Sequence, residues 1–476
     1  MHKIKFGTSG FRGIVGDDFT KQSVQKIGYA ICQILKEDKK MDKPVNVGFD
    51  NRFMGIFFAK WISEVFAFYG LKVRFFKNAV STPLIAFETK NASLGVQITA
   101  SHNYYYYNGI KVFIEFGRES DAFNKRIEKI ANQIEFSKIR TLDFDKAEKQ
   151  KLIILTDDLK PYCNSIASFV SCENIRKKNF KVLFNAFHGS SVECIKAVCE
   201  KIGIKNYEIM KSNVDPYFDY KVAAPYVHNV SDQIEKMKAN NYDIGFAFDA
   251  DGDRITILDK DGEAYDCNMI SAVFFYYFIK NKDIKGNFVK NSALTGLIDK
   301  ISDKFGLKTY NVKNGFKFIA SALIKNKNML MGAESNGIAI KQHLAYKDGL
   351  LPAIIMLDIL SRENKSIKVI INDLKREMNY PCEVLELAYP LTKKKRAEII
   401  NKVFIEKKLP LTPNEIIQVS YTNGCKMIYK NGYWGVIRFS GTENVVRIFA
   451  EMKNKEECNK YIKIYEDFIG VNQKQS

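Results

Sequence analysis

The sequence predicts an α/β protein built from several domains. The chain has 476 residues, and a single hydrophobic core rarely grows beyond about 250 to 300 residues, so the length favours several cores. Strand-like apolar stretches alternate with amphipathic helical patterns from Met1 to about Phe144, and two further segments of this kind follow. The last segment, from about Pro381, ends in a strand, a loop, a strand and a helix. We therefore expect four α/β-type segments in succession.

The composition is that of an ordinary globular protein. Hydrophobic residues make up 46% of the chain and charged residues 27%, which is enough to bury sizeable cores. No apolar run is long enough to span a bilayer, and the amino terminus lacks the apolar core of a signal peptide. We expect a soluble, cytoplasmic protein with no membrane partner. The nine cysteines are scattered without a C-x-x-C pair, so we expect reduced and mostly buried thiols.

The formal net charge of +19 could indicate nucleic acid, an anionic membrane surface or anionic small molecules as partners. Lysines are spread along the whole chain, however, with acidic residues between them. The densest basic run, at residues 393–396, has no interleaved aromatic residues. This pattern is typical of a solvated surface, so we expect no nucleic-acid partner.

A polar pentapeptide at residues 99–103, T-A-S-H-N, interrupts an apolar region of the first segment. Residues 94–98 alternate as a strand does, and residues 109–113 have the pattern of a second strand, so Ser101 is expected on the loop between them. Serine is a weak nucleophile, and a catalytic role needs a base, a cation or a phosphoryl group already attached. Because Ser, His and Asn are also ordinary loop residues, the pentapeptide alone does not decide.

Three aspartates, Asp249, Asp251 and Asp253, stand at alternate positions in a glycine-containing turn between two strand-like stretches. Carboxylates spaced in this way can converge on one hard cation, and ligation by oxygen alone suits Mg²⁺ better than Zn²⁺. An acidic hairpin turn is the alternative, but three like charges this close repel unless a cation neutralises them. An EF-hand is not favoured, since the turn continues into a strand and lacks the glutamate at its twelfth position.

Four motifs together resemble the alpha-D-phosphohexomutase family, the phosphoglucomutases and phosphomannomutases. That family has a phosphoserine loop T-A-S-H-N, a metal loop D-x-D-x-D-R, a sugar loop G-E-x-S and a phosphate loop R-x-S-G-T. The chain has corresponding stretches, in the same order, at Thr99–Asn103, Asp249–Arg254, Gly332–Gly337 and Arg438–Thr442. The resemblance covers essentially the whole chain, and four motifs in order are far more specific than any one.

The resemblance implies three similar α/β domains plus a smaller C-terminal α+β domain around a central cleft. The phosphoserine-loop domain is expected at residues 1–148 and the metal-loop domain at residues 149–258. The sugar-recognition domain is expected at residues 259–376 and the phosphate-binding C-terminal domain at residues 377–476.

The resemblance also implies an isomerase of carbohydrate metabolism, a phosphotransferase that interconverts hexose 1-phosphate and hexose 6-phosphate, with glucose, mannose or both as the sugar. Ser101 would carry a phosphoryl group, Mg²⁺ would be the cofactor, and a hexose 1,6-bisphosphate would be the intermediate and activator. These parts suit phosphoryl transfer, which needs charge neutralisation and in-line positioning. The expected partner is the hexose phosphate substrate, and a monomer or dimer is expected.

Individual roles follow from the motif matches. Arg12, in a glycine-rich turn, and Lys111, in N-G-I-K, would act beside the phosphoserine. Lys111 and His102 are both candidates for the general acid or base, and the sequence does not choose. The expected metal ligands are Asp249, Asp251, Asp253 and Ser101. The expected substrate contacts are Arg254, Glu334, Ser335, Lys347 and Lys317, and the expected phosphate contacts are Arg438, Ser440, Gly441, Thr442 and Arg447.

The chain departs from the family pattern in its sugar loop. Ala333 stands where the family usually has glutamate, and Glu334 follows directly. Glu334 replaces that glutamate by a small shift, or the contact to a sugar hydroxyl is lost. His188 lies in a turn similar to the family's H-G-x-G, with Ser191 for the second glycine, and we interpret it as a loop-shaping residue. The alternatives are a phosphoglucosamine mutase and, from another class, a non-catalytic sugar-phosphate-binding protein, against which the intact serine and metal loops argue.

Overall fold

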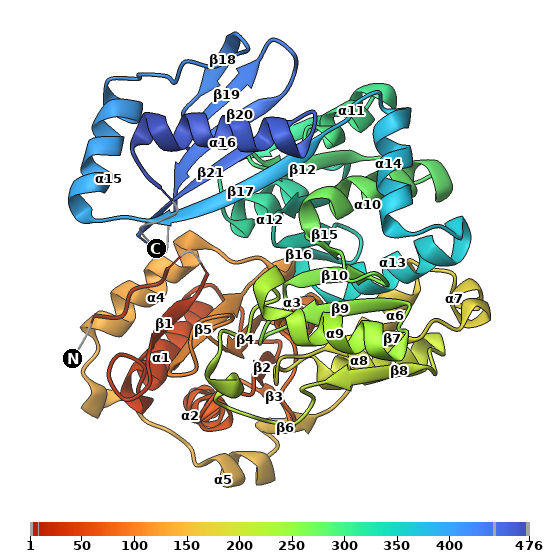
Figure 1. Ribbon diagram of the computed structural model, residues 1–476. Coiled ribbons are helices and arrows are strands. Elements are labelled where there is room, and N and C mark those ends of the chain that lie inside the picture. The colour runs from red at the N-terminus through yellow and green to blue at the C-terminus, as the bar shows by residue number, and fades with distance from the viewer. Residues whose placement is uncertain (1–2, 8, 441–443, 473–476) are drawn as a thin grey trace. The chain divides into compact units, whose positions relative to one another are not determined.

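The structure is a computed structural model that describes residues 3–7, 9–440 and 444–472. Its helices and strands are labelled along the chain in Figure 1. The chain divides into two compact units. The first unit comprises Met1–Cys267, Leu323–Lys327 and Asn336–Ser366, and the second comprises Asn268–Ala322, Asn328–Ser335 and Ile367–Ser476. The predicted fold class is confirmed, with three α/β domains and a β-rich C-terminal domain. The four domain boundaries given above stay a prediction.

The amino-terminal domain is a six-stranded sheet in the order β1-β5-β4-β2-β3-β6. Its strands are β1 (Phe11–Ile14), β2 (Val45–Phe49), β3 (Val73–Phe76), β4 (Leu94–Ile98), β5 (Tyr107–Phe113) and β6 (Ile153–Thr156). Its helices are α1 (Lys21–Glu37), α2 (Gly55–Phe68), α3 (Thr82–Phe87), α4 (Asp121–Gln133) and α5 (Phe144–Lys149). The strands expected on either side of Ser101 are present, and β4 pairs antiparallel to β5 with Gln97 opposite Lys111. A buried apolar cluster fixes this sheet against α1 and α2.

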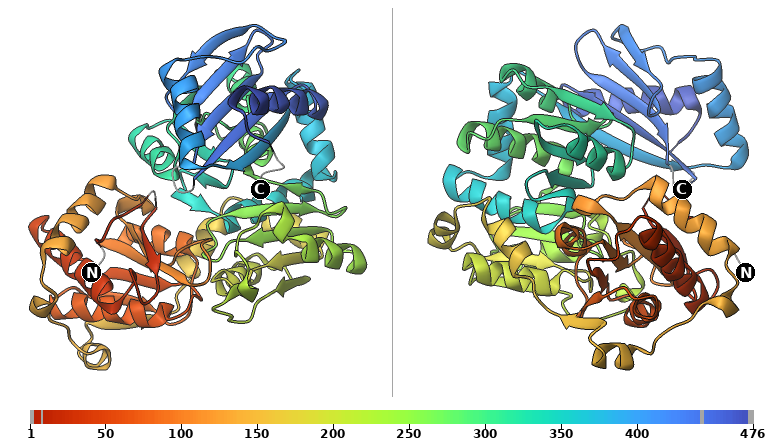
Figure 2. Two further views of the ribbon diagram at one scale, coloured as in Figure 1. Left: turned by 60° about the vertical axis from the view of Figure 1, so that its left-hand side comes forward. Right: turned by 180° about the vertical axis from the view of Figure 1, so that it is seen from behind.

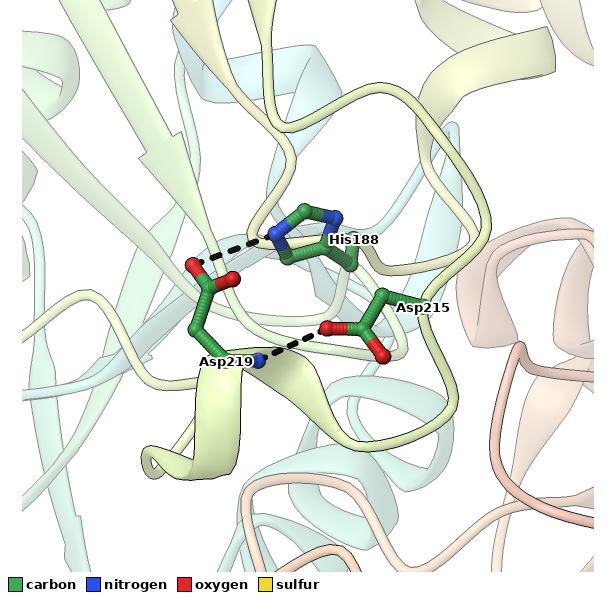
Figure 3. Close-up of side chains that lie close together, drawn as sticks. All are labelled: His188, Asp215 and Asp219. Atoms are coloured by element: carbon green, nitrogen blue, oxygen red, sulfur yellow. Dashed lines mark hydrogen bonds and ion pairs between the residues drawn. The ribbon is translucent and has the colours of Figure 1, made fainter.

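The second domain follows the same plan with a five-stranded sheet in the order β11-β10-β9-β7-β8. Its strands are β7 (Val182–Asn185), β8 (Tyr207–Met210), β9 (Ile244–Phe248), β10 (Ile255–Asp259) and β11 (Ala264–Tyr265). Its helices are α6 (Lys160–Ala167), α7 (Cys172–Lys178), α8 (Val192–Ile202) and α9 (Ser231–Asn240). The loops that follow β7 and β8 meet, and they bring His188 next to Asp219 (Figure 3). β9 and β10 form the hairpin that carries the three aspartates.

Residues 267–377 supply the third domain, in which β12 pairs in parallel with β13 and with β14, and β15 pairs antiparallel to β16. Its strands are β12 (Asn287–Asn291), β13 (Thr309–Val312), β14 (Met329–Glu334), β15 (Gly337–Ile340) and β16 (Leu344–Asp348). Its helices are α10 (Cys267–Asn281), α11 (Leu297–Lys304), α12 (Phe316–Lys325), α13 (Leu350–Glu363) and α14 (Ile367–Glu377). The Asp348 carboxylate accepts hydrogen bonds from two backbone N–H groups in the first turn of α13, which fixes the end of β16.

The C-terminal domain is an antiparallel sheet in the order β17-β21-β20-β19-β18. Its strands are β17 (Glu383–Pro390), β18 (Ile416–Ser420), β19 (Cys425–Tyr429), β20 (Trp434–Phe439) and β21 (Val445–Met452), and its helices are α15 (Lys393–Ile399) and α16 (Lys455–Ile469). α16 lies along one face of this sheet (Figure 2), where Tyr389 of β17 donates a 2.6 Å hydrogen bond to the Glu466 carboxylate of α16. The predicted order of strand, loop, strand and helix is confirmed in β20, β21 and α16.

None of the nine cysteines forms a disulfide, and all but Cys172 are buried, as expected. Within the described part of the chain, no helix has the length and apolar character needed to cross a membrane.

Candidate active site

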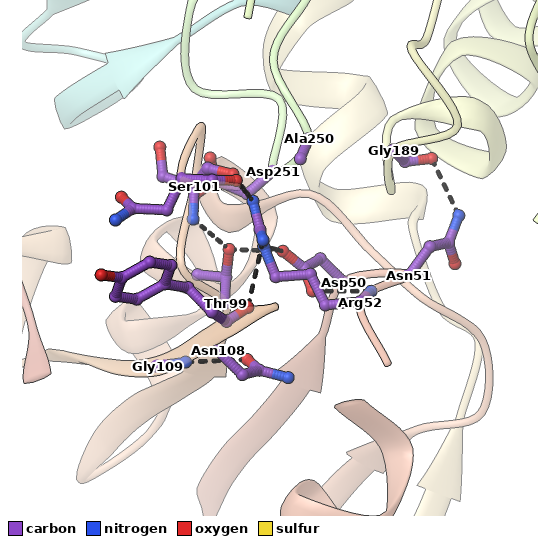
Figure 4. Close-up of polar contacts among 12 residues, drawn as sticks. Asp50, Asn51, Arg52, Thr99, Ser101, Asn108, Gly109, Gly189, Ala250 and Asp251 are labelled. Atoms are coloured by element: carbon purple, nitrogen blue, oxygen red, sulfur yellow. Dashed lines mark hydrogen bonds and ion pairs between the residues drawn. The ribbon is translucent and has the colours of Figure 1, made fainter. Parts of the chain in front are cut away.

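The backbone at Ser101 is held in a conformation that L-residues rarely adopt. Ser101 follows β4 and has a φ of 53°, in the left-handed region. Its N–H donates a 2.8 Å hydrogen bond to Thr99 Oγ1, and the Thr99 hydroxyl in turn donates to Asp50 Oδ2 at 2.5 Å (Figure 4). Ser101 is 1% exposed. Local hydrogen bonds therefore fix the direction in which its hydroxyl points.

Arg52 organises the loop between β4 and β5. Its guanidinium is buried, with its Nε 3.3 Å from Asp50 Oδ2. Its terminal nitrogens donate hydrogen bonds to four main-chain carbonyls of the loop, those of Ser101, Asn103, Tyr104 and Tyr107. The turn containing Arg52 resembles the family's supporting D-x-R turn, yet sequence reasoning did not count Arg52 among the site residues. Its four hydrogen-bond acceptors in the loop are backbone atoms, which leave no trace in a sequence.

The three predicted metal ligands, Asp249, Asp251 and Asp253, here called the aspartate triad, lie in the β9–β10 turn and are fully buried. Suitable carboxylate oxygens of the three lie within 4.8 Å of one another. The Ser101 hydroxyl donates a 3.0 Å hydrogen bond to Asp249 Oδ2. The structure thus brings together the two motifs that lie about 150 residues apart in the sequence.

Glycine is required within the aspartate turn. Gly252 has a φ of +70°, and a Cβ built there would lie 2.5 Å from Ser191 Oγ. Any larger residue at this position would be strained and would push the turn away from the neighbouring loop.

Basic side chains surround the aspartate triad. Lys111 Nζ lies 2.6 Å from Asp251 Oδ2 and 2.7 Å from Asp253 Oδ2, and Lys347 Nζ lies 2.8 Å from Asp253 Oδ1. Burial alone lowers the pKa of Lys111, but the two carboxylates outweigh burial and raise that pKa above its ordinary value. Burial raises the pKa of Asp253, but Lys111 and Lys347 hold it well below the usual range. Both Lys111 and Asp253 are therefore charged.

The third aspartate differs from its neighbours. Burial, followed by the charges of Asp251 and Asp253, raises the pKa of Asp249 well above its usual value. The nearest cation is Arg254, whose Nε lies 3.7 Å from Asp249 Oδ2. Asp249 is thus the carboxylate that most needs a further positive charge.

The residues of the triad fit a magnesium ion. The donor set consists of oxygen atoms alone, which is what Mg²⁺ prefers. Asp251 Oδ1 is buried and has no hydrogen-bond partner within the described residues. An unpaired carboxylate oxygen in a buried position is expected to face a cation.

Two contacts to the aspartates were not predicted from the sequence. The Thr82 hydroxyl donates a 2.6 Å hydrogen bond to Asp251 Oδ2, and the Tyr346 hydroxyl donates one of 2.9 Å to Asp253 Oδ2. Thr82 opens α3, outside every motif. Tyr346 directly precedes Lys347, and this position was its only sequence signal.

The remaining predicted catalytic residues also lie in this part of the first unit. Arg12 Nη1 donates a 2.5 Å hydrogen bond to Asn103 Oδ1, and burial lowers the pKa of Arg12. His102 Nδ1 lies 3.3 Å from Ser101 Oγ. Burial, with Arg254 and Arg12 adding to its effect, lowers the pKa of His102 well below the ordinary value, so its imidazole is neutral at neutral pH.

The predicted phosphate contacts lie in the second unit. Arg438 on β20 is directly opposite Arg447 on β21, and like charges in this position destabilise a sheet. Glu386 pairs with Arg447 at 2.7 Å. Arg438 is 7% exposed, and its Nε and Nη1 have no hydrogen-bond partner in the described chain. A buried guanidinium with two nitrogens that lack hydrogen-bond partners, beside a second arginine, is suited to an anion such as phosphate.

Three further predicted phosphate residues follow β20. The Ser440 N–H donates a 3.0 Å hydrogen bond to the Val445 carbonyl, which closes the β20–β21 loop. Gly441 and Thr442 lie outside the described residues.

In the sugar loop, Glu334 and not Ala333 has the accessible side chain. Ala333 is fully buried like the rest of β14 before it, whereas Glu334, the last residue of the strand, is partly exposed. Burial lowers the pKa of Arg438, and the carboxylates of Glu386 and, more weakly, Glu334 oppose this shift. If the G-E-x-S pattern is aligned one residue later, its glutamate is Glu334 and the serine position is taken by Asn336.

The other predicted substrate contacts are distributed over the two units. Ser335 follows Glu334 directly. Lys317 lies on α12, with its Nζ 5.4 Å from the centre of the Phe318 ring. Of the two lysines expected to hold a distal phosphate, Lys347 is the one that lies beside the aspartate triad.

This fold and this arrangement define a sugar-phosphate mutase, a class of isomerases. Three family models match in succession, those described as phosphoglucomutase/phosphomannomutase alpha/beta/alpha domain I at residues 3–138, domain II at residues 160–262 and domain III at residues 266–378. The chain therefore belongs to the phosphoglucomutase/phosphomannomutase family, within the alpha-D-phosphohexomutases.

Related proteins match over nearly their whole length. The chain is 27% identical over 463 residues to a phosphoglucomutase/phosphomannomutase of Thermococcus kodakarensis, with 96% of this chain and 97% of that protein covered. It is 28% identical over 474 residues to a phosphoglucosamine/phosphogalactosamine mutase of Sulfurisphaera tokodaii, again with 96% and 97% covered. The crystal structure of a putative phosphomannomutase from Thermus thermophilus has the same fold, with a TM-score of 0.84, 22% identity and 98% and 99% of the two chains covered.

Proposed function

We propose that this protein is a Mg²⁺-dependent phosphohexomutase that interconverts hexose 1-phosphate and hexose 6-phosphate, with glucose or mannose as the sugar. The observation that carries the proposal is the position of Ser101. Its hydroxyl lies 3.0 Å from Asp249 Oδ2 and is directed at the aspartate triad, at which positive side chains also converge. This is an arrangement for positioning a phosphoryl group and neutralising its charge.

In the proposed reaction, the bond between Ser101 Oγ and phosphorus breaks, and a sugar hydroxyl oxygen forms a new bond to phosphorus. The bisphosphorylated sugar then returns its other phosphoryl group to Ser101 by the reverse exchange. When bound at the triad, Mg²⁺ supplies charge neutralisation for the transferred group. Lys111 is protonated and adds positive charge. The neutral imidazole of His102, whose Nδ1 lies 3.3 Å from Ser101 Oγ, would take the proton of the attacking hydroxyl and pass a proton to the Ser101 oxygen as its bond to phosphorus breaks.

Further residues are assigned to the anion and to the sugar in this proposal. Arg438 and Arg447 hold the phosphate that is not reacting, and Glu334 accepts hydrogen bonds from sugar hydroxyls. The partly exposed carboxylate of Glu334 supports this assignment over a non-catalytic sugar-phosphate-binding protein, for which Ala333 is the main sequence argument.

A phosphoglucosamine mutase is the second candidate. It is supported by the names of several relatives, among them the phosphoglucosamine mutase of Prochlorococcus marinus strain MIT 9515, which is 28% identical over 459 residues. The two candidates share the phosphoserine chemistry and differ in the substituent at the second carbon of the sugar.

Intact-protein mass spectrometry and a mutase assay test the proposal together. We expect a phosphate adduct that is absent from Ser101→Ala, and interconversion of glucose 1-phosphate or mannose 1-phosphate that this variant loses. Glucosamine 1-phosphate is assayed in parallel, each time with the matching 1,6-bisphosphate present. An adduct that survives Ser101→Ala would show that another residue carries the phosphoryl group. Turnover of glucosamine 1-phosphate alone would select the second candidate.

A further inference from the structure

A second group of metal-ligating side chains lies outside the aspartate triad, where the loops after β7 and β8 meet (Figure 3). His188 comes from the β7 loop, and Asp215 and Asp219 come from the β8 loop. One potential ligand atom from each of the three lies within 4.8 Å of the others. The proposed mutase reaction makes no use of these residues.

The hydrogen bonding of His188 defines which ring nitrogen is available. The residue is 6% exposed. Its Nδ1 lies 3.1 Å from the Asn213 carbonyl oxygen, and because a carbonyl only accepts, Nδ1 carries the hydrogen. In the neutral ring, Nε2 therefore presents a lone pair. Histidines that bind metals usually donate their other N–H to a backbone carbonyl in this way.

Nε2 of His188 has no aligned hydrogen-bond partner in the described chain, although it is buried. The atom nearest to it in the cluster is Asp219 Oδ2, at 3.2 Å. At this distance the two atoms share a positive charge, which is either a proton on Nε2 that makes the contact an ion pair or a metal ion in the place of that proton. In a tetrahedral zinc site with bonds of about 2.0 to 2.2 Å, neighbouring ligand atoms are about 3.3 to 3.5 Å apart, close to the separation seen here.

The charges around His188 leave a deficit of positive charge. Three acidic residues, Asp215, Asp219 and Asp232, are gathered there. Lys211 is the cation that pairs with them, at 3.3 Å from Asp219 Oδ2 and 3.1 Å from Asp232 Oδ2. The two oxygens of Asp215 accept hydrogen bonds from the backbone N–H groups of Tyr217 and Asp219, which aim the carboxylate and leave each oxygen a second lone pair. A divalent cation would balance the remaining charge.

We propose that His188, Asp215 and Asp219 bind a zinc ion. One imidazole nitrogen and two carboxylate oxygens suit Zn²⁺ better than Mg²⁺, which prefers oxygen ligands alone. The Asp219 side chain is 45% exposed, so water can complete the coordination. Lys211 gives up Asp219 to the metal and keeps Asp232 as its partner.

The zinc ion would have a structural role, because the two loops it joins support the Ser101 loop. Asn51 Nδ2 donates hydrogen bonds to the carbonyls of His188 and Gly189, at 2.8 and 3.1 Å. Phe218, next to Asp219, packs its ring 5.0 Å from the guanidinium carbon of Arg52. Zinc binding would therefore raise the thermal stability of the first unit without touching the substrate.

The experiment is a zinc titration of the full chain in excess Mg²⁺. Zinc content after dialysis against buffered micromolar Zn²⁺ is measured by mass spectrometry of the metal, and Tm is measured on the same samples. We expect the unmodified protein to hold one zinc ion more than His188→Gln and Asp219→Asn, and to show a zinc-dependent rise in Tm that both variants lose. Asp232→Asn is the matched control, since it removes a neighbouring acid that is not a ligand, and it should keep the zinc.

Equal zinc content in the unmodified protein and in both variants would overturn the proposal. Should the variants fail to fold, anomalous diffraction at the zinc edge from crystals of the unmodified protein decides. A peak beside His188 Nε2 supports the site, and a peak confined to the aspartate triad refutes it. Neither result depends on mutase activity, so the test is independent of the proposed function.

Discussion

Replacing Arg52 should reveal how strongly the chain depends on one buried guanidinium. Arg52→Met removes the donor for four loop carbonyls and leaves the Asp50 carboxylate buried without its cation. Removing one partner of a buried ion pair typically costs about 3 to 5 kcal/mol, most of it from the charge left behind. We therefore expect Arg52→Met to lower the free energy of unfolding of the first unit by about that amount.

A double-mutant cycle isolates the ion pair. Asp50→Asn removes the stranded charge, so the double variant should be more stable than the sum of the two single effects predicts, by about 1 to 3 kcal/mol. The chain has two tryptophans, and Trp61 lies on α2 shortly after Arg52. In a Trp434→Phe background, Trp61 fluorescence during urea unfolding therefore reports on the first unit alone. A loss of less than about 1 kcal/mol in Arg52→Met, or strict additivity, would refute the reasoning.

Three further changes probe other parts of the chain. Chelation should abolish mutase activity, and added Mg²⁺ should restore it. Asp251→Asn should remove the metal dependence or the turnover. Full activity of the chelated protein would contradict the assignment of the aspartate triad as the metal site. Glu334→Ala should lower kcat/KM by about tenfold to a hundredfold, because a carboxylate hydrogen bond contributes about 1.5 to 3 kcal/mol. Kinetics equal to those of the unmodified protein would exclude Glu334 as a sugar contact. Burial, with Lys290 adding to it, lowers the pKa of Lys426 from 10.5 to about 7. Above pH 7, Lys426 is mostly deprotonated in the folded chain but still protonated in the unfolded chain. The free energy of unfolding therefore rises by about 2 kcal/mol from pH 7 to pH 9. Lys426→Met should not show this rise when urea unfolding is followed by Trp434 fluorescence. If the variant kept the same pH dependence as the unmodified protein, that result would count against the lowered pKa.

The sequence was most informative for site residues that lie in turns at the ends of strands. The strand at residues 94–98 and the aspartate turn were predicted because alternation and turn residues are local signals, and the structure shows both. The meeting of Ser101 with Asp249 followed from the family resemblance, since no local pattern relates residues so far apart.

Other contacts could not be predicted because they depend on packing. The hydrogen bond from Thr82 to Asp251 spans 169 positions of the sequence, and the Arg52 network uses backbone acceptors that any residue would offer. At the sugar loop, sequence spacing left open whether Glu334 takes the place of the glutamate expected at position 333. In the structure β14 is buried from Met329 to Ala333, and Glu334 at the end of the strand is partly exposed. A contact from Glu334 to the sugar stays a prediction.

The salt bridges of Lys111 and Lys347 have a consequence for how the protein matures. The three carboxylates of the aspartate triad face these two lysines and Arg254, so the chain carries its own counterions in its interior. Under the proposed function, folding would then precede metal loading, and the metal-free protein would stay folded but inactive. Arrival of a divalent ion would give the same interior a surplus of positive charge, which attracts a phosphate dianion. Under the proposed function, the magnesium concentration would then set the fraction of active molecules without new synthesis or degradation.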